Sequence, residues 1–476
     1  MGPLIGEDGL LPAAPYLDKV AGAYSEGFSA YTKVPTLLWF DCSDAAMYTL
    51  CYTGVAASLL LLSGFSSGLL LALLWALYMS LYHVGQVFYG YGWEILLLET
   101  GFLAIFLCPL LRGGLLPARA PPSRMVIWLF RWILFRVVFG AGLIKLRGDA
   151  CWLDLTCMMY HYETQPIPNP ISWYLHQLPP FVHMVSVLGT HFVELVVPWM
   201  LFGRRRFRHI AGGVMIAFQI LLICSGNLSW LNWLTIALSI PCFDDEALKT
   251  LCPRVFLRRL QSLKEIKESK VRRGAAYSLS LLILLLSIEP VINLISPGQV
   301  MNRSFHSLHL VNTYGAFGSV GKQRLEVVLQ GTYATTLDEF TEWRDYEFKC
   351  KPGDVKRHPC VVSPYHYRLD WQIWFAAMSD YRSHPWLIHF VYKLLQGDKG
   401  ALSLLAENPF VEGPPRFVRA ELYQYQFTRF GDAPDAWWKR RRVAGYLPPL
   451  SAENPALLEV LESFGWLKGG EKDRKD

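Results

Sequence analysis

The feature that most restricts this chain is a series of long apolar runs before Asn302. A helix needs roughly 20 mostly apolar residues to cross a membrane. Candidate spans lie at 45–65, 69–89, 92–111, 124–144, 184–202, 210–224, 228–241 and 275–295. Together they predict a multi-pass α-helical membrane domain over residues 45–296.

Three of these runs allow more than one arrangement. The runs at 210–224 and 228–241 are short and are separated by "SGN", which is consistent with a tight hairpin or with one broken helix. The run at 92–111 contains Glu94 and Glu99 and is consistent with a re-entrant segment. Charged residues at membrane depth are costly, so a polar run of this kind needs a specific reason to be there.

Composition separates the apolar part from a soluble part. Only 18% of the residues are charged, against about 25% in an ordinary soluble domain, and the deficit falls mostly before Asn302. The net charge of +6 is modest and gives no support for binding to nucleic acid.

Lysine and arginine in the short connections predict the orientation. The connections 112–124, 203–209 and 258–273 are basic and are expected in the cytosol. Alternation then puts the loop 145–183 and everything after about residue 296 on the opposite side, which is the lumen of the endoplasmic reticulum in a eukaryotic cell.

The residues after Asn302 predict a luminal α+β domain over 303–466, with antiparallel strands. Aromatic and branched residues predict strands at 306–317, 323–334, 345–351, 364–375 and 419–430. Helical spacing predicts helices at 385–397, 401–410 and 454–466. The tail 467–476 is expected to be disordered.

The predicted luminal side holds four cysteines in two close pairs. The lumen permits disulfides, so Cys151–Cys157 and Cys350–Cys360 are the economical pairing, and four free thiols are the alternative. Two Asn-x-Ser sequences also lie near the membrane. We expect no glycan at Asn227, and Asn302 is a possible N-glycosylation site.

Several charged residues interrupt the apolar runs. Such residues usually face the bundle interior and pair with one another. We expect one buried ion-pair network that fixes helix packing, formed by Glu94, Glu99, Arg131, Arg136 and Glu194. The alternative interpretation is a catalytic or transport site.

Motifs for chemistry are sparse. The sequence has no GxSxG, HExxH, Walker lysine loop or CxxC. His191 and Glu194 in "HFVEL" share one helix face, but no third metal ligand can be named, and zinc sites need at least three protein ligands. We therefore expect no catalytic residue, no metal site and no cofactor. The proline-rich segment 158–170 is either a stiff connector or a binding edge.

Long segments of the chain are similar to one known family. They include "LWALYMSLYHVGQVFYGYGWEILLLETGFLAIFLCPL", "GAGLIKLRGDACWLDLTCMMYHYETQPIPNP", "SGNLSWLNWLTIALSIPCFDD", "HSLHLVNTYGAFGS" and "YEFKCKPGDVKRHPCVVSPYHYRLDWQIWFAAM". From Ile5 to Trp466 the chain resembles the lipase maturation factor family, and is nearest to its factor 1 branch. Members usually carry a first span before the stretch that matches "LIGEDGLLPA". That span is missing here, so residues 1–44 are expected to be a luminal N-terminal segment.

The resemblance implies a function and partners. It implies a multi-pass protein of the endoplasmic reticulum membrane that is not an enzyme. Such a protein helps lipases of the lipoprotein lipase and hepatic lipase type to fold, assemble into dimers and be secreted. Client lipases in the lumen, membrane lipids and other folding factors are the implied partners. The alternative is a membrane-embedded enzyme that acts on a luminal protein or lipid through the intramembrane charges.

Overall fold

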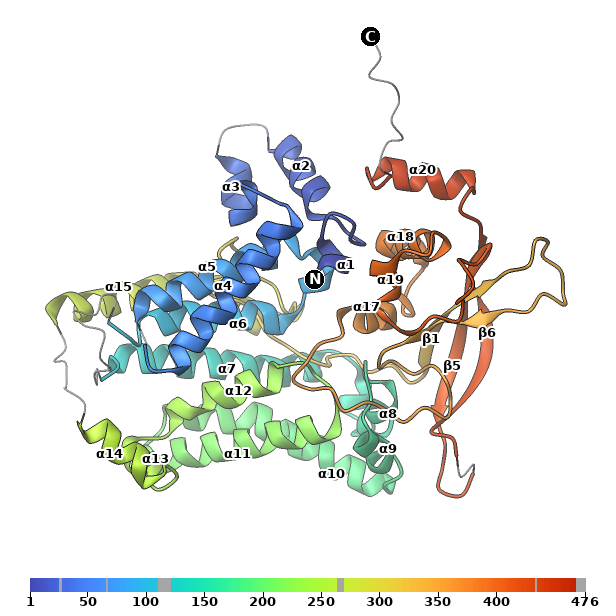
Figure 1. Cartoon of the computed structure of the whole chain (residues 1–476). Helices are drawn as coiled ribbons and strands as arrows, with labels where there is room; N and C mark the ends of the chain where they lie inside the picture. Colours follow the sequence, from blue (N-terminus) through green and yellow to red (C-terminus); the bar gives the residue numbers. More distant parts are fainter. Residues whose placement is uncertain (25–27, 66, 110–120, 263–268, 433–434, 468–476) are drawn as a thin grey trace, which may run out of the picture.

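A computed structural model describes residues 1–24, 28–65, 67–109, 121–262, 269–432 and 435–467. Long helices lie alongside one another and form one part of the molecule (Figure 1). At one end of these helices lie the short helices α13 (Asp245–Lys249) and α14 (Arg254–Ser262). A β-sheet lies at the other end (Figure 1).

Five helical segments are long and apolar enough to cross a membrane. They are α4 (Asp44–Leu62), α7 (Arg124–Arg147), the continuous run of α10 (Pro180–His191), η4 (Phe192–Val196) and η5 (Val197–Phe202), α11 (Arg205–Ser225), and α15 (Lys270–Leu286) with α16 (Ile288–Ile295). The prediction of a multi-pass α-helical membrane domain is confirmed.

The other three apolar runs form helices shorter than a span. They are α5 (Gly68–Val84), α6 (Gly92–Ile105) and α12 (Leu231–Ser239). The 14 residues of α6 reach about 21 Å at about 1.5 Å per residue, less than a hydrocarbon core of about 30 Å. Helix α12 packs beside α11. Residues 210–241 therefore form a hairpin and not one broken helix.

The connections predicted to be cytosolic are described only in part. Arg205, in the connection 203–209, forms an ion pair with Asp244, next to α13. Residues 110–120 of the connection 112–124 and residues 263–268 of the connection 258–273 lie outside the described residues. The same holds for residues 468–476 of the predicted disordered tail.

The C-terminal part is an antiparallel sheet covered by helices. Its strand order is β2 (Arg344–Asp345), β1 (Arg324–Thr332), β5 (Phe417–Phe427), β6 (Trp438–Leu450). Strands β3 (Glu347–Phe348) and β4 (Leu405–Glu407) form a second small sheet. The accompanying helices are α17 (Arg368–Ala376), α18 (Pro385–Leu395), α19 (Lys399–Leu402) and α20 (Pro455–Ser463). The predicted α+β class with antiparallel strands is confirmed.

Some of the predicted elements in this part are wrong. Segment 364–375 contains helix α17, because Leu369, Ile373 and Ala376 share one buried helix face. Segment 306–317 forms no strand in the described chain apart from one isolated bridge at Asn312, because its polar groups bond to the membrane domain instead.

Two further differences concern the last third of the chain. The predicted helix 401–410 holds only the end of α19 and then strand β4. Strand β6 was not predicted. Most of its side chains are exposed and four consecutive ones are basic, so it lacks the half-buried alternation that identifies a strand.

The N-terminal residues pack on the C-terminal part. They form α1 (Gly2–Ile5), α2 (Ala13–Ala23) and α3 (Ser29–Lys33). Ile5 and Leu10 share one apolar core with Phe390 of α18. The His389 ring Nδ1 lies 2.8 Å from the Leu10 carbonyl oxygen. Residues 1–24 therefore do not form a core of their own.

The loop between α7 and α10 also packs on the sheet. It contains α8 (Met158–Thr164) and α9 (Pro170–His176). The Trp173 indole N–H donates to the Thr428 hydroxyl at 3.2 Å, and the Arg324 guanidinium of β1 donates to the carbonyl oxygens of Glu163 and Pro166 at 2.9 Å each. The remaining short helices are η1 (Leu37–Trp39), η2 (Gln86–Tyr89), η3 (Ala150–Trp152), η6 (Ile240–Cys242) and η7 (Tyr381–Ser383).

Candidate functional site

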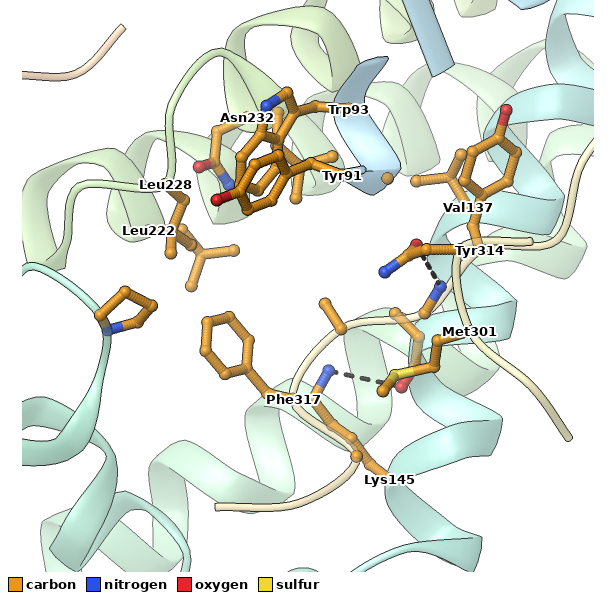
Figure 2. Close-up of a pocket in the computed structure, with 18 of the residues that line it drawn as sticks. Tyr91, Trp93, Val137, Lys145, Leu222, Leu228, Asn232, Met301, Tyr314 and Phe317 are labelled. Carbon is orange, nitrogen blue, oxygen red and sulfur yellow. Dashed lines mark hydrogen bonds between the residues drawn. The ribbon is translucent and has the colours of Figure 1, made fainter. Parts of the chain in front are cut away.

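The candidate site is a cavity at the junction of the helical part and the C-terminal part. We call it the junction cavity; its volume is about 410 Å³. Most of its walls come from α7, α11, α12, the loop 301–319 and α17, and η4 and α8 also contribute. Figure 2 shows Val137, Leu222, Leu228, Met301 and Phe317 around this space, so most of the wall is apolar.

One buried ion pair lines the junction cavity. The Lys145 ammonium donates to both carboxylate oxygens of Glu194 at 2.8 Å and approaches the Ala141 carbonyl oxygen at 3.4 Å. Glu194 lies in η4, a π turn between α10 and η5. Single π turns inside helices are frequent at functional sites.

A second pair fixes the loop 301–319 to the helices. Arg136 of α7 and Glu99 of α6 are bonded and are each 1% exposed. Arg136 also donates to the Asn312 carbonyl oxygen at 2.6 Å. Glu99 accepts the Asn312 backbone N–H at 3.0 Å and the Tyr314 hydroxyl at 2.7 Å. Both charges therefore have hydrogen-bond partners besides each other.

A third pair joins helix α17 to the helical part. The Arg368 guanidinium donates to a Glu94 carboxylate oxygen at 2.7 Å and to the Phe88 carbonyl oxygen at 2.5 Å. Its centre lies 3.6 Å from the centroid of the Tyr89 ring. The Tyr78 hydroxyl donates to the same carboxylate.

These contacts replace the single predicted network by three separate pairs. Arg131 joins none of the acidic partners in the described part of the chain. Its guanidinium donates to the Pro241 carbonyl oxygen at 3.2 Å and lies 5.2 Å from the Trp128 ring. The prediction was wrong here because the turn after α12 brings a backbone acceptor to Arg131, and a sequence pattern does not identify that neighbour.

His191 and Glu194, which form the HxxE pattern, bond to different partners. The His191 ring Nε2 lies 3.0 Å from the Trp152 carbonyl oxygen, whereas Glu194 bonds to Lys145. Within the described residues, no three His, Cys, Asp or Glu side chains are grouped to hold a metal ion. A second histidine, His161 of α8, lines the junction cavity. Burial and the nearby Lys145 lower the pKa of His161 to about 4, so its ring is neutral at pH 7.

The structure joins Cys151 to Cys157 and Cys350 to Cys360 by disulfides. Buried Asp370 of α17 accepts the backbone N–H groups of Cys350 and Lys351, at 2.6 and 2.9 Å. Burial raises the pKa of Asp370 above its ordinary value, and these two donors act in the opposite direction. The Cys350–Cys360 segment is thus held at one end by a carboxylate.

Comparisons with known proteins follow this division of the chain. Residues 1–250 match the family model described as the lipase maturation factor transmembrane domain, and residues 310–448 match the lipase maturation factor C-terminal domain. The chain belongs to the lipase maturation factor family. Its similarity to lipase maturation factor 1 of Homo sapiens is 49% identity over 486 residues, which cover 97% of this chain and 85% of the relative.

More distant members of the lipase maturation factor family are also similar. Lipase maturation factor 2 of Xenopus laevis is 34% identical over 579 residues, covering 97% of this chain and 80% of the relative. The lower identity to factor 2 places the chain nearer the factor 1 branch, as predicted. No solved structure matches the chain.

The predicted ion-pair network of this lipase maturation factor family member left out two basic residues that pair with its carboxylates, Lys145 and Arg368. Lys145 stands near the end of an apolar run, where a basic residue also marks a membrane boundary, so its pairing with Glu194 was not predicted. Arg368 fell in a segment predicted to be a strand. A helical pattern at 368–376 was the available signal, because it would have placed Arg368 at the start of a buried helix.

The Asn227 amide is a further contact that the sequence did not reveal. Asn227 is 2% exposed and donates to the Cys360 and Ile167 carbonyl oxygens at 2.9 and 3.2 Å. It accepts the backbone N–H groups of Val362 and Ser363 at 2.9 and 3.2 Å. A glycan has no room on this amide. Asn302, by contrast, is exposed at the rim of the junction cavity.

Asn227→Ala is expected to loosen this attachment. The variant leaves two backbone N–H groups without an acceptor, which costs about 1–3 kcal/mol. Limited proteolysis of the full chain should then cut near Ser363 sooner than in the wild type. Asn302→Ala is the matched control and should leave this cleavage unchanged. Equal cleavage in both variants would contradict the role given to Asn227.

Cys350→Ser is expected to weaken the C-terminal part without removing a chemical step. The disulfide closes a loop with a sequence separation of 10, and such a loop constrains the unfolded chain by about 2–3 kcal/mol. Thermal unfolding of the full chain measures the effect. The control is Cys252→Ser, because Cys252 has no disulfide partner. Free thiols at Cys350 and Cys360 in unreduced peptides would refute the prediction.

Proposed function

We propose that this chain acts in the endoplasmic reticulum membrane as a maturation factor for secreted lipases, and that it is not an enzyme. The proposal rests on its similarity to proteins named lipase maturation factor 1 over 95–97% of the chain. In this role the chain assists folding, dimer assembly and secretion of lipases of the lipoprotein lipase and hepatic lipase type. Other folding factors of the lumen are its further proposed partners.

The proposed topology puts three segments in the lumen: the N-terminal segment 1–44, the loop 145–183 and the C-terminal domain 303–466. Apart from that loop, residues 45–296 form the transmembrane domain, whose basic connections lie in the cytosol. Its support is that the three segments pack on one another through Leu10, Trp173 and Arg324. A membrane cannot separate segments that share hydrogen bonds and an apolar core. The basic helix α14 lies at the far end of the long helices, away from the sheet (Figure 1).

The exposed aromatic side chains of the C-terminal domain are the proposed contacts for clients. Phe340 is 85% exposed, Phe430 66% and Tyr365 63%. A lipase that has not yet completed its own core exposes apolar surface, and such side chains bind that surface without a specific chemical reaction.

The pairing of the buried charges supports a structural role for them. Each of Glu94, Glu99 and Glu194 has a basic partner and is at most 6% exposed. A membrane-embedded enzyme is the second candidate, because Lys145 and Glu194 line the junction cavity.

Lys145→Arg separates these two candidates. Arginine keeps the positive charge but cannot lose its proton near neutral pH, so it retains an ion pair and abolishes acid–base chemistry. The test is lipase activity secreted from factor-deficient cells that express the wild type, the variant or neither. Activity near the wild-type level with Lys145→Arg supports the maturation factor. Loss of activity at normal protein abundance supports the enzyme, and no activity with the wild type would refute both.

Protease protection tests the topology. In intact microsomes, added protease should spare residues after about 296 and should cut the basic connections that are accessible from the cytosol. With detergent, the C-terminal domain should become accessible too. Digestion of that domain without detergent would overturn the proposed orientation.

A further inference from the structure

Helix α9 crosses the end of the membrane bundle between two candidate spans. At its start, the Asn169 side-chain N–H donates at 2.9 Å to the carbonyl oxygen of Cys224, one residue before the end of α11. At its other end, only residues 177–179 separate α9 from α10. Figure 1 shows α9 beside the start of α10, at the end of the bundle that faces the sheet. Both ends of α9 are therefore held where a candidate span begins or ends.

The span from α10 to η5 is longer than the hydrocarbon core is thick. Its 23 residues extend for about 35 Å at about 1.5 Å per residue. The core is about 30 Å thick, or about 40–45 Å with both interfacial layers. The ends of this span therefore reach the interfacial layers, and α9, which is joined to one end, lies at the level of such a layer.

One side of α9 packs on the C-terminal sheet. The Trp173 indole N–H donates to the Thr428 hydroxyl at 3.2 Å, and the Gln177 side-chain N–H donates to the Thr428 carbonyl oxygen at 3.0 Å. Thr428 directly follows β5. These contacts fix the rotation of α9 about its own axis, so they also fix which side chains are left uncovered.

The side chains that α9 leaves uncovered are apolar. Ile171, Tyr174 and Leu178 are 47%, 53% and 38% exposed, and their spacing of three and four residues places them on one face of the helical turns. We call these three residues the α9 face. The exposed apolar surface continues along the chain on α10, where Phe181 and Val185 are 72% and 49% exposed.

The position of the α9 face identifies what covers it. Phe181 belongs to a candidate span, so lipid covers its exposed side chain in the membrane. Leu178 is three residues earlier, which is at most about 11 Å along an extended chain. Helices at a membrane interface bury an apolar face about 5–10 Å into the boundary between headgroups and acyl chains. Tyrosine is enriched at this level, because its ring is apolar and its hydroxyl group is polar.

We propose that α9 lies in the luminal interface of the membrane, with Ile171, Tyr174 and Leu178 buried between the headgroups and the acyl chains of phospholipids. The side of the membrane rests on the proposed topology, which puts the loop 145–183 in the lumen. The contact with lipid itself does not depend on which protein is the client.

This contact also fixes the C-terminal domain relative to the membrane. Through Trp173 and Gln177, α9 holds Thr428 at the end of β5. The ring of Phe430, one of the proposed client contacts, lies 6.2 Å from the ring of Tyr174. A client that binds at Phe430 is therefore met at the membrane surface.

Photo-crosslinking from lipid tests the proposal. The purified full chain is reconstituted into phosphatidylcholine nanodiscs, in which a fraction of the lipid carries a diazirine close to the ester group of one acyl chain. We expect labels on the α9 face at a level similar to that on Phe181 of the span. Phe340 is the internal control and should stay unlabelled. It is 85% exposed and lies in the connection between β1 and β2, which points away from the long helices (Figure 1).

Labels on Phe181 without labels on the α9 face would overturn the proposal and leave a protein partner as the cover of this face. The labelling does not depend on which side of the membrane holds α9, because both leaflets of the nanodisc carry the probe. A failed protease-protection experiment would therefore refute the topology, whereas missing labels on the α9 face would refute the contact with lipid.

A double variant tests the apolar side chains themselves. Ile171→Asp with Tyr174→Asp should reduce labelling of Leu178 at least about tenfold. Tenfold corresponds to only about 1.4 kcal/mol, and burial of two such apolar side chains contributes more than this. Equal labelling of Leu178 in the double variant and in the wild type would refute the insertion of α9.

The matched control for the double variant is Phe340→Asp with Val411→Asp. It puts two carboxylates at apolar positions that are 85% and 89% exposed and should leave labelling of Leu178 unchanged. A loss of labelling in this control as well would show that added charge acts on the whole chain and not on α9. The wild-type labelling pattern decides the matter if the double variant does not fold.

Discussion

Arg136→Leu is expected to reduce the stability and abundance of the protein severely. The variant leaves the Glu99 carboxylate buried at 1% exposure without its cation, and removing one partner of a buried pair costs about 3–5 kcal/mol. It also removes the donor to the Asn312 carbonyl oxygen, so the loop 301–319 loses this hydrogen bond to α7. Thermal unfolding in detergent and abundance in cells measure the effect.

Arg131→Leu is the matched control on the same helix. Among the described residues, Arg131 donates only to the Pro241 carbonyl oxygen. Its removal therefore leaves none of the described carboxylates buried and unpaired and should cost clearly less. The double variant Arg136→Leu with Glu99→Leu should recover part of the lost stability, because neither charge is then left alone. Normal abundance of Arg136→Leu together with lost lipase maturation would contradict the structural role and favour the enzyme.

A stop codon after Tyr392 is expected to abolish lipase maturation while membrane insertion continues. All five long apolar helices of the described part of the chain precede this point. The truncation removes β5 and β6, and β5 pairs with β1 along the nine residues from Arg324 to Thr332. Strand β1 would be left with an unpaired edge and an exposed apolar core. Membrane extraction and secreted lipase activity in factor-deficient cells are the two measurements.

A stop after Leu467 is the control for that truncation, because it keeps β5, β6 and α20. It should insert and support lipase activity as the full chain does. Full lipase activity from the chain that ends at Tyr392 would move the client site to the loop 145–183 or to the membrane domain, and would refute the role proposed for the C-terminal domain.

Local sequence patterns predicted an element correctly where the property that stabilises it lies within the segment itself. The apolar runs identified the five long helices, because a membrane selects length and hydropathy, which a single segment carries. Strands β1 and β5 were predicted from their aromatic and branched residues, and helices α18 and α20 from helical spacing, because these properties also lie within a single segment.

Helix α17 and strand β6 show where such patterns fail. In α17 the aromatic residues around Trp371 resemble a strand, yet the helix is favoured because Arg368 reaches Glu94 and Asp370 reaches Cys350 from it. Residues of β6 form a strand because they pair with β5. Their exposed basic side chains show no alternation of buried and exposed positions from which a strand could be predicted.

The sequence by itself determined that this protein has several membrane-spanning helices, that an α+β domain follows them, and that charged residues lie among the apolar runs. These are properties of composition and spacing along the chain. Only the tertiary structure decided which charges pair. Glu94 bonds to Arg368, 274 positions away, and Arg131 bonds to a backbone carbonyl oxygen. The junction cavity arises in the same way, because its walls come from helices and a loop that are distant in sequence. Packing alone brings such groups together, and a buried charge takes the partner that packing places within hydrogen-bond distance.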